Sequence, residues 1–404
     1  MSSLNLTREQ RVLIDRAAAQ HALKQYEILT EIGSTKGDNY LGVLHIITLR
    51  DSTGKQISLI LKTAPLDDAV RLQGRMPQVF KREAFIYGKI LPEFQQIQKE
   101  YGIKKPFLGA ATYYGSDLTE KQESILMENL KLNDYQLCDR TQPMNEEHII
   151  VVFSEYARFH AASFALRHLR KEKFEELTKD IHYSVFQNPT ANPEETAKVL
   201  ENYVEAGVKS IKGNTKAVAA LEKMKLNIMD LFKNSMVQGR ERFVVVHGDC
   251  WCNNMLFKYR EKNPSDVCFI DWQLSQLASP VKDLAYFFSV SGSKETYRNL
   301  NRYLEIYYRV LSENLKEFKL NPEEIFSFQD LMEEWNNNAY YGVFISLMVL
   351  KLMLSNSDEA PTLQGAYKGE SILASLTNFQ TTKSSEYERR LVDLIEFMAD
   401  NKYI

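Results

Sequence analysis

Two short apolar runs in the middle of the chain end in side chains that could carry out phosphoryl transfer. Phe243–Val246 leads into a His-Gly-Asp sequence ending at Asp249, and Asn254 follows five residues later. Val267–Ile270 ends at Asp271. Short runs of β-branched and aromatic residues bounded by Gly, Pro or Asp are typical of buried strands. The sequence therefore places two carboxylates and one carboxamide at the ends of neighbouring strands.

These three side chains divide naturally into two roles. The oxygen atoms of Asn254 and Asp271 are the hard ligands that Mg²⁺ prefers. Asp249 then remains free to meet a substrate hydroxyl, which completes the residue set that phosphoryl transfer from a nucleotide requires. A single aspartate after a strand is more often a turn residue. The ordered set, with a histidine two residues before the first aspartate, is much harder to obtain by chance and favours a catalytic site.

The residue order in these two segments resembles motifs of known protein families. HGDCWCNN followed by IDW resembles the catalytic-loop and metal-loop pair of the aminoglycoside phosphotransferase and choline kinase group, small-molecule relatives of the protein kinases. The fuller pattern HGD-x-W-x-x-N and then IDWQ is similar to the insect ecdysteroid kinase-like family, also described as CHK kinase-like. The resemblance implies an enzyme that uses ATP and Mg²⁺ to phosphorylate an alcohol, and it extends from Gly33 to the C-terminal helices.

The bulk composition is typical of ordinary soluble globular chains. Of 404 residues, 44% are hydrophobic and 25% charged, and the net charge of −3 favours neither nucleic acid nor an anionic membrane. The N-terminus lacks the apolar core of a signal peptide, and the longest apolar stretch, Ala339–Leu354, is short for a membrane span. The four cysteines lack zinc-site spacing. We expect a cytoplasmic protein with free thiols, a small-molecule partner, and no membrane or nucleic-acid partner; no oligomeric state follows.

The first part of the chain predicts an antiparallel sheet. A helix over Glu9–Lys24 precedes strands over Tyr26–Ile32, Leu41–Arg50 and Gln56–Lys62, and a turn signal separates the last two. With the helices expected later, this is an α+β chain. The resemblance implies a bilobal protein kinase-like fold, with a small antiparallel β-rich N-lobe over residues 1–128 and a larger, mainly helical C-lobe over residues 129–404.

A glycine-containing loop connects the first two predicted strands. Gly33, Gly37 and Gly42 do not fit the G-x-G-x-x-G spacing of protein kinases, so an ordinary hairpin loop is the alternative. The stretch resembles the GD/EN-Y loop of the ecdysteroid kinase-like family. Because glycines let the backbone approach phosphate closely, we expect Gly33, Gly37 and Asn39 to contact the nucleotide.

A lysine and a glutamate follow in the order that kinases use. Lys62 ends an apolar strand, where a cation needs an anionic partner. Glu83 lies on a predicted helix, and a Lys–Glu pair between strand and helix positions the phosphates in protein kinases. The alternative is a snorkelling surface lysine and an unrelated glutamate. A mobile connection is expected for four charged residues between them, Asp67, Asp68, Arg71 and Arg75.

Two further strands are predicted over Pro106–Gly115 and Glu123–Leu130. The second contains Met127, Glu128 and Asn129, where the resemblance places the passage between the lobes. Backbone groups there would bond adenine, and a plain strand end is the alternative. Apolar periodicity then predicts helices. Their ranges are Glu146–Leu169, Pro193 to about Gly207, Lys216–Phe232, Leu300–Phe318, Phe328–Leu354 and Glu386–Met398.

Three polar residues near the proposed site are interpreted as structural. We expect His160 to be a hydrogen-bonded core histidine, His247 to order the catalytic loop, and Asp283 to cap or anchor its helix. Gly365–Ser384, rich in Ser, Thr, Gly and Lys, is expected to form a loop.

The acceptor alcohol does not follow from the motifs. An ecdysteroid, or another steroid-like or xenobiotic alcohol, is implied by the family, and choline, ethanolamine or an aminoglycoside is the alternative. A catalytically inactive kinase-fold binding protein is disfavoured because the lysine, the loop carboxylate and both metal ligands are present. A dinuclear metallophosphatase is disfavoured because the seven histidines show no ligand grouping.

Overall fold

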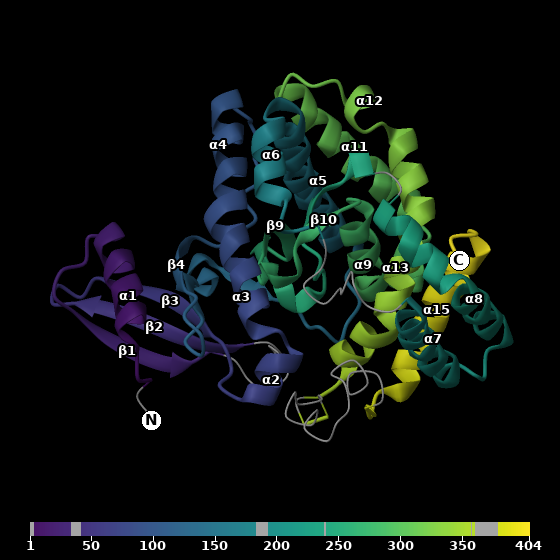
Figure 1. The fold of residues 1–404 in the computed structure, drawn as a ribbon, viewed down its shortest axis with the longest axis horizontal. Helices are drawn as coiled ribbons and strands as arrows, with labels where there is room; N and C mark the ends of the chain where they lie inside the picture. Colours follow the sequence, from purple (N-terminus) through teal and green to yellow (C-terminus); the bar gives the residue numbers. More distant parts are fainter. Residues whose placement is uncertain (1–3, 34–41, 183–192, 238–239, 357, 360–378) are drawn as a thin grey trace.

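The computed structural model describes residues 4–33, 42–182, 193–237, 240–356, 358–359 and 379–404. An antiparallel sheet formed by the first part of the chain lies at one end of the molecule, and a mainly helical body makes up the rest (Figure 1). The predicted α+β class, with a β-rich region followed by a larger helical one, is confirmed. The boundary predicted near residue 128 stays a prediction.

Five strands form the N-terminal sheet in the order β1-β2-β3-β5-β4. Their bounds are β1 Tyr26–Ile32, β2 Val43–Asp51, β3 Gln56–Thr63, β4 Tyr113–Asp117 and β5 Ser124–Glu128. The first three match the predicted strands to within two residues. Successive side chains of a strand point to opposite faces, so each strand supplies one row of side chains to each side of the sheet.

The two faces of this sheet have different neighbours. Leu59 and Leu61 pack with Leu13 and Ile14 of α1, Arg8–Gln20, in a small core on one face. Lys62 is the next residue of β3 and therefore points to the opposite face. There α3, Met76–Phe85, supplies Glu83. The strand alternation thus explains why a lysine in an apolar strand meets a helix carboxylate rather than solvent.

The helical body is built around α5 and α13. Its helices are α4 Leu91–Tyr101, α5 Glu146–Leu169, α6 Lys171–Thr178, α7 Pro193–Ser210, α8 Thr215–Val237, α9 Val281–Ser291, α10 Lys294–Tyr297, α11 Leu300–Glu317, α12 Pro322–Ile325, α13 Phe328–Leu354 and α15 Ser384–Asp400. The predicted bounds of α5 and α13 are confirmed. By length and composition Glu146–Leu169 and Pro322–Leu354 could cross a membrane, but 78% and 72% of their apolar windows are buried inside the protein.

Two small sheets carry the polar motifs. β7, Val244–Val246, pairs antiparallel with β10, Gln276–Ala278. β8, Met255–Arg260, forms a hairpin with β9, Asn263–Phe269, and β6, Tyr135–Leu137, joins its outer edge. The catalytic motif follows β7 and the second aspartate follows β9, as the apolar runs predict.

The strand predicted over Pro106–Gly115 is wrong for most of its length, because β4 begins only at Tyr113. Side chains satisfy part of the earlier backbone. Phe107 N–H donates to Gln98 Oε1 at 2.6 Å, and Leu108 N–H donates to Glu155 Oε1 at 3.2 Å. The next two residues contact β9, since Phe269 N–H donates to Gly109 O at 2.8 Å and Ala110 forms an isolated parallel bridge with Phe269. Because Glu155 and Phe269 lie far along the chain, the apolar run alone predicts a strand where the segment is irregular.

The mobile connection predicted around Asp67 is also wrong. Asp67 accepts a hydrogen bond from Val70 N–H at 2.9 Å and caps α2, Asp68–Gln73. Arg71 is 6% exposed and makes a bidentate ion pair with the buried Glu123, at 2.9 and 2.6 Å. A local sequence pattern cannot indicate an ion pair between residues that are 52 positions apart. It fixes α2 against the strand β5.

We expect Glu123→Gln to destabilise the fold by about 3 kcal/mol, because the guanidinium of Arg71 would keep its burial and lose its counter-charge. The control is Asp68→Asn at the exposed ion pair with Lys121, where solvent screening should make the effect much smaller. Urea denaturation of both variants measures the difference. Equal destabilisation by the two substitutions would contradict this account of α2.

Candidate active site

A buried aspartate holds the loop that follows β7. Asp283 of α9 is fully buried and accepts hydrogen bonds from His247 N–H at 2.7 Å and Gly248 N–H at 2.9 Å. His160 Nε2 lies 3.3 Å from the same carboxylate. Burial opposes ionisation of Asp283, but the hydrogen bond and charge of His160, the charge of His247 and the loop N–H outweigh it and keep its pKa below the usual value.

The conformation of Gly248 requires glycine. Its φ is +83°, in the left-handed region, and a Cβ there would lie 2.4 Å from the carbonyl oxygen of Leu274. His247, the preceding residue, is buried, and its Nε2 lies 2.9 Å from Ile270 O. The tight turn and this side chain therefore bring the loop after β7 against the end of β9. His247 orders the loop as expected, and burial lowers its pKa.

Both carboxylate oxygens of Asp249 have partners. Tyr286 OH donates to Oδ1 at 2.9 Å, and Asn254 Nδ2 donates to Oδ2 at 2.8 Å. Asn254 Nδ2 also donates to the backbone oxygen of Asp249 at 3.0 Å. The side chain of Asp249 is thus fixed from two sides, with its orientation set by α9 and by the short helix Cys252–Asn254.

The environment of Asp249 disfavours its charged form. Burial and the negative charge of Asp271 raise the pKa of Asp249 to about 7, against the opposing hydrogen bonds from Tyr286 and Asn254. A carboxyl group whose pKa lies near neutrality can accept a proton and release it again under physiological conditions. The position thus has the properties of a general base, which is the role the sequence suggests.

Lys62 connects the sheet to the second aspartate. Its ammonium lies 2.7 Å from Glu83 Oε2 and 2.7 Å from Asp271 Oδ1, and its side chain is 3% exposed. Burial disfavours the ammonium, but the two carboxylates outweigh it and hold the pKa of Lys62 above its usual value. Burial and the charge of Asp271 raise the pKa of Glu83 to about 7. The predicted Lys–Glu pair is therefore present, with Asp271 as a second partner.

The expected metal ligands come from adjoining segments. Ile270 N–H donates to Asn254 O at 3.0 Å, which joins the segment before Asp271 to the catalytic loop. Asp271 has a left-handed φ of +65° and uses Oδ1 for Lys62. No described residue hydrogen-bonds its Oδ2. A carboxylate oxygen and a carboxamide oxygen next to a negatively charged cluster are a donor set that suits Mg²⁺.

A cavity of about 140 Å³ adjoins this cluster. Its polar lining includes Lys62, Glu83 and Asp271. Its apolar walls agree with the expectation of apolar surfaces above and below an adenine ring, although the sequence did not identify the residues. Leu44, Ile46 and Ile60 come from the sheet, and Leu130, Leu137, Leu256 and Ile270 come from the other side. Apolar surfaces on two sides with a few directed polar groups are what a nucleotide base requires.

The residues expected at the passage between the lobes also line this cavity. They are Met127, Glu128 and Asn129. Two of their backbone donors are already used, since Glu128 N–H donates to Thr112 O at 2.9 Å and Asn129 N–H donates to Ser58 O at 3.3 Å. Adenine bonding at those two N–H groups would replace these contacts.

The phosphate loop is described only at its ends. Gly33 lines the cavity, while the predicted contacts Gly37 and Asn39 lie outside the described residues. At the other end, a Cβ on Gly42 would lie 3.1 Å from Lys62 Cε. The backbone at Gly42 therefore passes close over the lysine side chain.

Sequence reasoning missed Tyr286 and underestimated Asp283. Tyr286 lies one turn after Lys282 on α9 and hydrogen-bonds the proposed base directly. Asp283 anchors the catalytic loop, whereas the expectation concerned its own helix. The lysine–glutamate–aspartate cluster, by contrast, is assembled from the residues that the sequence singles out. Among the described residues no group of three or more His, Cys, Asp and Glu side chains lies in a position to hold a metal.

Comparison with solved structures finds distant similarities. Aminoglycoside 2'-phosphotransferase-IIIa, solved as its GDP complex, is 10% identical with a TM-score of 0.43, covering 98% of this chain and 100% of that one. Macrolide 2'-phosphotransferase MphH from Brachybacterium faecium is 13% identical with a TM-score of 0.38, covering 91% and 97%. A glucosamine kinase in complex with glucosamine, ADP and phosphate is 8% identical with a TM-score of 0.32, covering 98% and 100%. These likenesses are too weak to support an argument about substrate.

Comparison with protein families is more specific. No curated protein matches the chain. The profile of the ecdysteroid kinase-like family matches residues 36–320, which contain Lys62, Glu83, Asp249, Asn254 and Asp271. The match covers more than half of the 404 residues, and the chain therefore belongs to the ecdysteroid kinase-like family.

Proposed function

We propose that this protein transfers the terminal phosphate of ATP to the hydroxyl group of a small-molecule alcohol. One observation carries the proposal: a continuous set of contacts joins Lys62 through Asp271 and the catalytic-loop residue Asn254 to Asp249. A cation for the phosphates, oxygen ligands for a metal and a base for the acceptor thus lie together. Membership of the ecdysteroid kinase-like family supports small-molecule phosphotransfer.

Each residue has a distinct task in the proposed reaction. Lys62, fixed by Glu83, holds the phosphates of the bound nucleotide. Asp249, held between Tyr286 and Asn254, orients the acceptor hydroxyl and takes its proton late in the transfer. Asn254 and Asp271 would hold Mg²⁺, which supplies positive charge to the phosphate oxygens. Binding a nucleotide frees Asp271 from Lys62, because the phosphates replace that carboxylate as the partner of the ammonium.

The acceptor we propose is an ecdysteroid or another steroid-like alcohol. The support is family membership, and the residues that bind the acceptor are left open. A screen of ATP consumption over steroid, phenolic and amino-alcohol acceptors, with mass detection of the added phosphate, tests this choice. Phosphorylation of amino alcohols alone would transfer the proposal to a choline or ethanolamine kinase.

We expect Asp249→Asn to reduce kcat by about a thousandfold, because the amide cannot accept the acceptor proton. Nucleotide binding should persist, since Asp249 does not line the nucleotide cavity. Asp266→Asn, at an exposed position within β9, is the control and should keep full activity. Turnover by Asp249→Asn at the wild-type rate would remove the general base from the proposal.

Substitutions at the buried Lys62 and at its partner Glu83 should change stability and activity independently. Lys62→Met leaves Glu83 and Asp271 without their cation, so we expect loss of about 3 kcal/mol of folding free energy and loss of activity. The double variant Lys62→Met/Glu83→Gln should recover much of the stability, because the buried negative charge is gone, and none of the activity. Thermal denaturation and an ATP-consumption assay measure both. Recovery of activity in the double variant would show that Lys62 does not act on phosphates.

The metal site can be tested by its Mg²⁺ requirement. Asn254→Ala should raise the Mg²⁺ concentration for half-maximal activity by about tenfold or more, because a ligand and the support of Asp249 are both removed. Asn263→Ala, at the exposed first residue of β9, is the control. Chelation of divalent ions should stop turnover in all variants. An unchanged Mg²⁺ requirement in Asn254→Ala would argue against this residue as a ligand.

A further inference from the structure

A second cavity, of about 620 Å³, lies beside the β7–β10 pair. Its walls come from the end of α5, from α6, from the segment before β7, from β10 and from the first turn of α9. Of its described lining residues, none lines the nucleotide cavity. Six basic side chains surround it: Arg167, His168, Lys171, His182, Arg240 and Lys282.

Lys282 is the unusual member of this group. It is 8% exposed, yet among the described residues no carboxylate lies within 4.0 Å of its ammonium and no hydrogen bond reaches it. Its Nζ instead lies 5.5 Å from the ring centre of Tyr341. Burial lowers the pKa of Lys282 to about 8, against the attraction of Glu334. A buried ammonium with no carboxylate in direct contact is costly, so a bound anion would complete the site.

Arg167 is a second cation without a carboxylate in direct contact. Its guanidinium donates to Phe243 O at 2.6 Å and to Arg240 O at 2.7 Å, and it lies 5.4 Å from the ring centre of Phe174. No carboxylate of the described chain lies within 4.0 Å of it. Burial lowers the pKa of Arg167 against the longer-range attraction of Glu241 and Glu175, so its contacts hold the arginine at the cavity wall without a direct ion pair.

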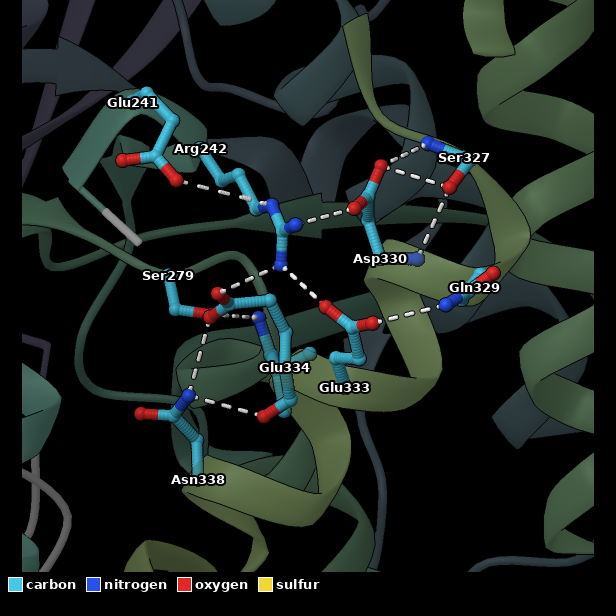
Figure 2. Close-up of polar contacts among 10 residues, drawn as sticks. Glu241, Arg242, Ser279, Ser327, Gln329, Asp330, Glu333, Glu334 and Asn338 are labelled. Carbon is cyan, nitrogen blue, oxygen red and sulfur yellow. Dashed lines mark hydrogen bonds and ion pairs between the residues drawn. The ribbon is translucent and has the colours of Figure 1, made fainter. Parts of the chain in front are cut away.

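Several acidic side chains near this cavity form ion pairs with Arg242. Figure 2 shows Arg242 surrounded by carboxylates of α13 and of its own neighbour Glu241. The distances are 2.5 Å to Asp330, 3.1 Å to Glu333, 3.8 Å to Glu334 and 4.0 Å to Glu241. Arg242 does not line the cavity.

The cavity therefore keeps an excess of positive charge. Its lining holds four arginines and lysines against two glutamates. Of these two, Glu241 lies beside Arg242 and Glu175 lies 3.9 Å from Lys171. The side chains of Phe174, Phe243 and Leu277 complete the wall with apolar surface.

We propose that this cavity binds a small organic anion, with its phosphate, sulfate or carboxylate group against Lys282 and its apolar part against Phe174 and Leu277. The volume lies within the roughly 300–1,000 Å³ typical of small-molecule sites. A charge-assisted contact to the buried ammonium would supply both affinity and orientation. This site is separate from the nucleotide cavity, and its occupancy does not depend on the proposed transfer reaction.

Calorimetric titration of the full chain with 1-naphthyl phosphate tests the proposal, in the presence of saturating Mg·ADP to fill the nucleotide cavity. We expect the wild type to bind this probe and Lys282→Met to bind it about tenfold more weakly or worse. The control is Lys258→Met, which removes another lysine lying over a tyrosine, 5.6 Å from the ring centre of Tyr135 and outside the cavity lining. This control should bind as the wild type does.

Titration with inorganic phosphate shows whether the site binds a free ion or an organic anion. Competition by inorganic phosphate at similar concentration indicates a free-ion ligand, whereas binding of 1-naphthyl phosphate alone indicates an organic one. Lys282→Met should keep the wild-type Tm, because it removes an unpaired buried charge, so lost binding cannot be ascribed to unfolding. Equal affinity of Lys282→Met and wild type, tighter binding of uncharged 1-naphthol, or no binding of any probe at millimolar concentration overturns the proposal. Asp249→Asn should bind 1-naphthyl phosphate normally, which separates this result from the kinase proposal.

Discussion

The shared ion pair of Lys62 holds the two halves of the proposed site together. One ammonium from β3 contacts a carboxylate of α3 and a carboxylate that follows β9, each at 2.7 Å. All three groups are at most 13% exposed. In such surroundings a lone charge is strongly disfavoured, so each group needs the others. The two ion pairs of Lys62 therefore hold the sheet, α3 and the segment after β9 in one relative arrangement.

A second constraint operates behind the catalytic loop. Asp283 is fully buried and receives N–H groups of His247 and Gly248, while His160 contacts it from α5. The positive φ of Gly248 lets the loop turn tightly enough to reach that carboxylate. Lys62 thus fixes the side of the site next to the sheet, and Asp283 fixes the loop that carries Asp249.

The sequence identifies many of the residues that meet here from local signals, although Lys62 and Asp271 lie 209 residues apart. Asp249 and Asn254 are five residues apart, and the apolar runs before Asp249 and Asp271 identify the strands that carry them. The strands β1 to β3 and the helices α5 and α13 follow from periodicity alone. In each of these cases the information lies within about twenty residues of chain, which is the range over which a local pattern can be read.

The features that sequence reasoning missed depend on distant partners. Arg71 meets Glu123 across 52 residues, and Leu108 N–H meets Glu155 across 47. Tyr286 reaches Asp249 from a helix 37 residues further on. The cavity around Lys282 is a stronger example, since its four arginines and lysines come from four separate segments and nearby acidic side chains pair with Arg242. No single stretch of sequence contains that balance.

The hydrogen bonds of His160 connect the helix packing to the loop after β7. Its Nδ1 contacts Tyr307 of α11 at 2.9 Å, and its Nε2 faces Asp283, which accepts the N–H of His247. A core substitution at Tyr307 would therefore change the support of this loop from the far side of α5. The interior packing between α5 and α11 and the position of Asp249 are in this way mechanically linked.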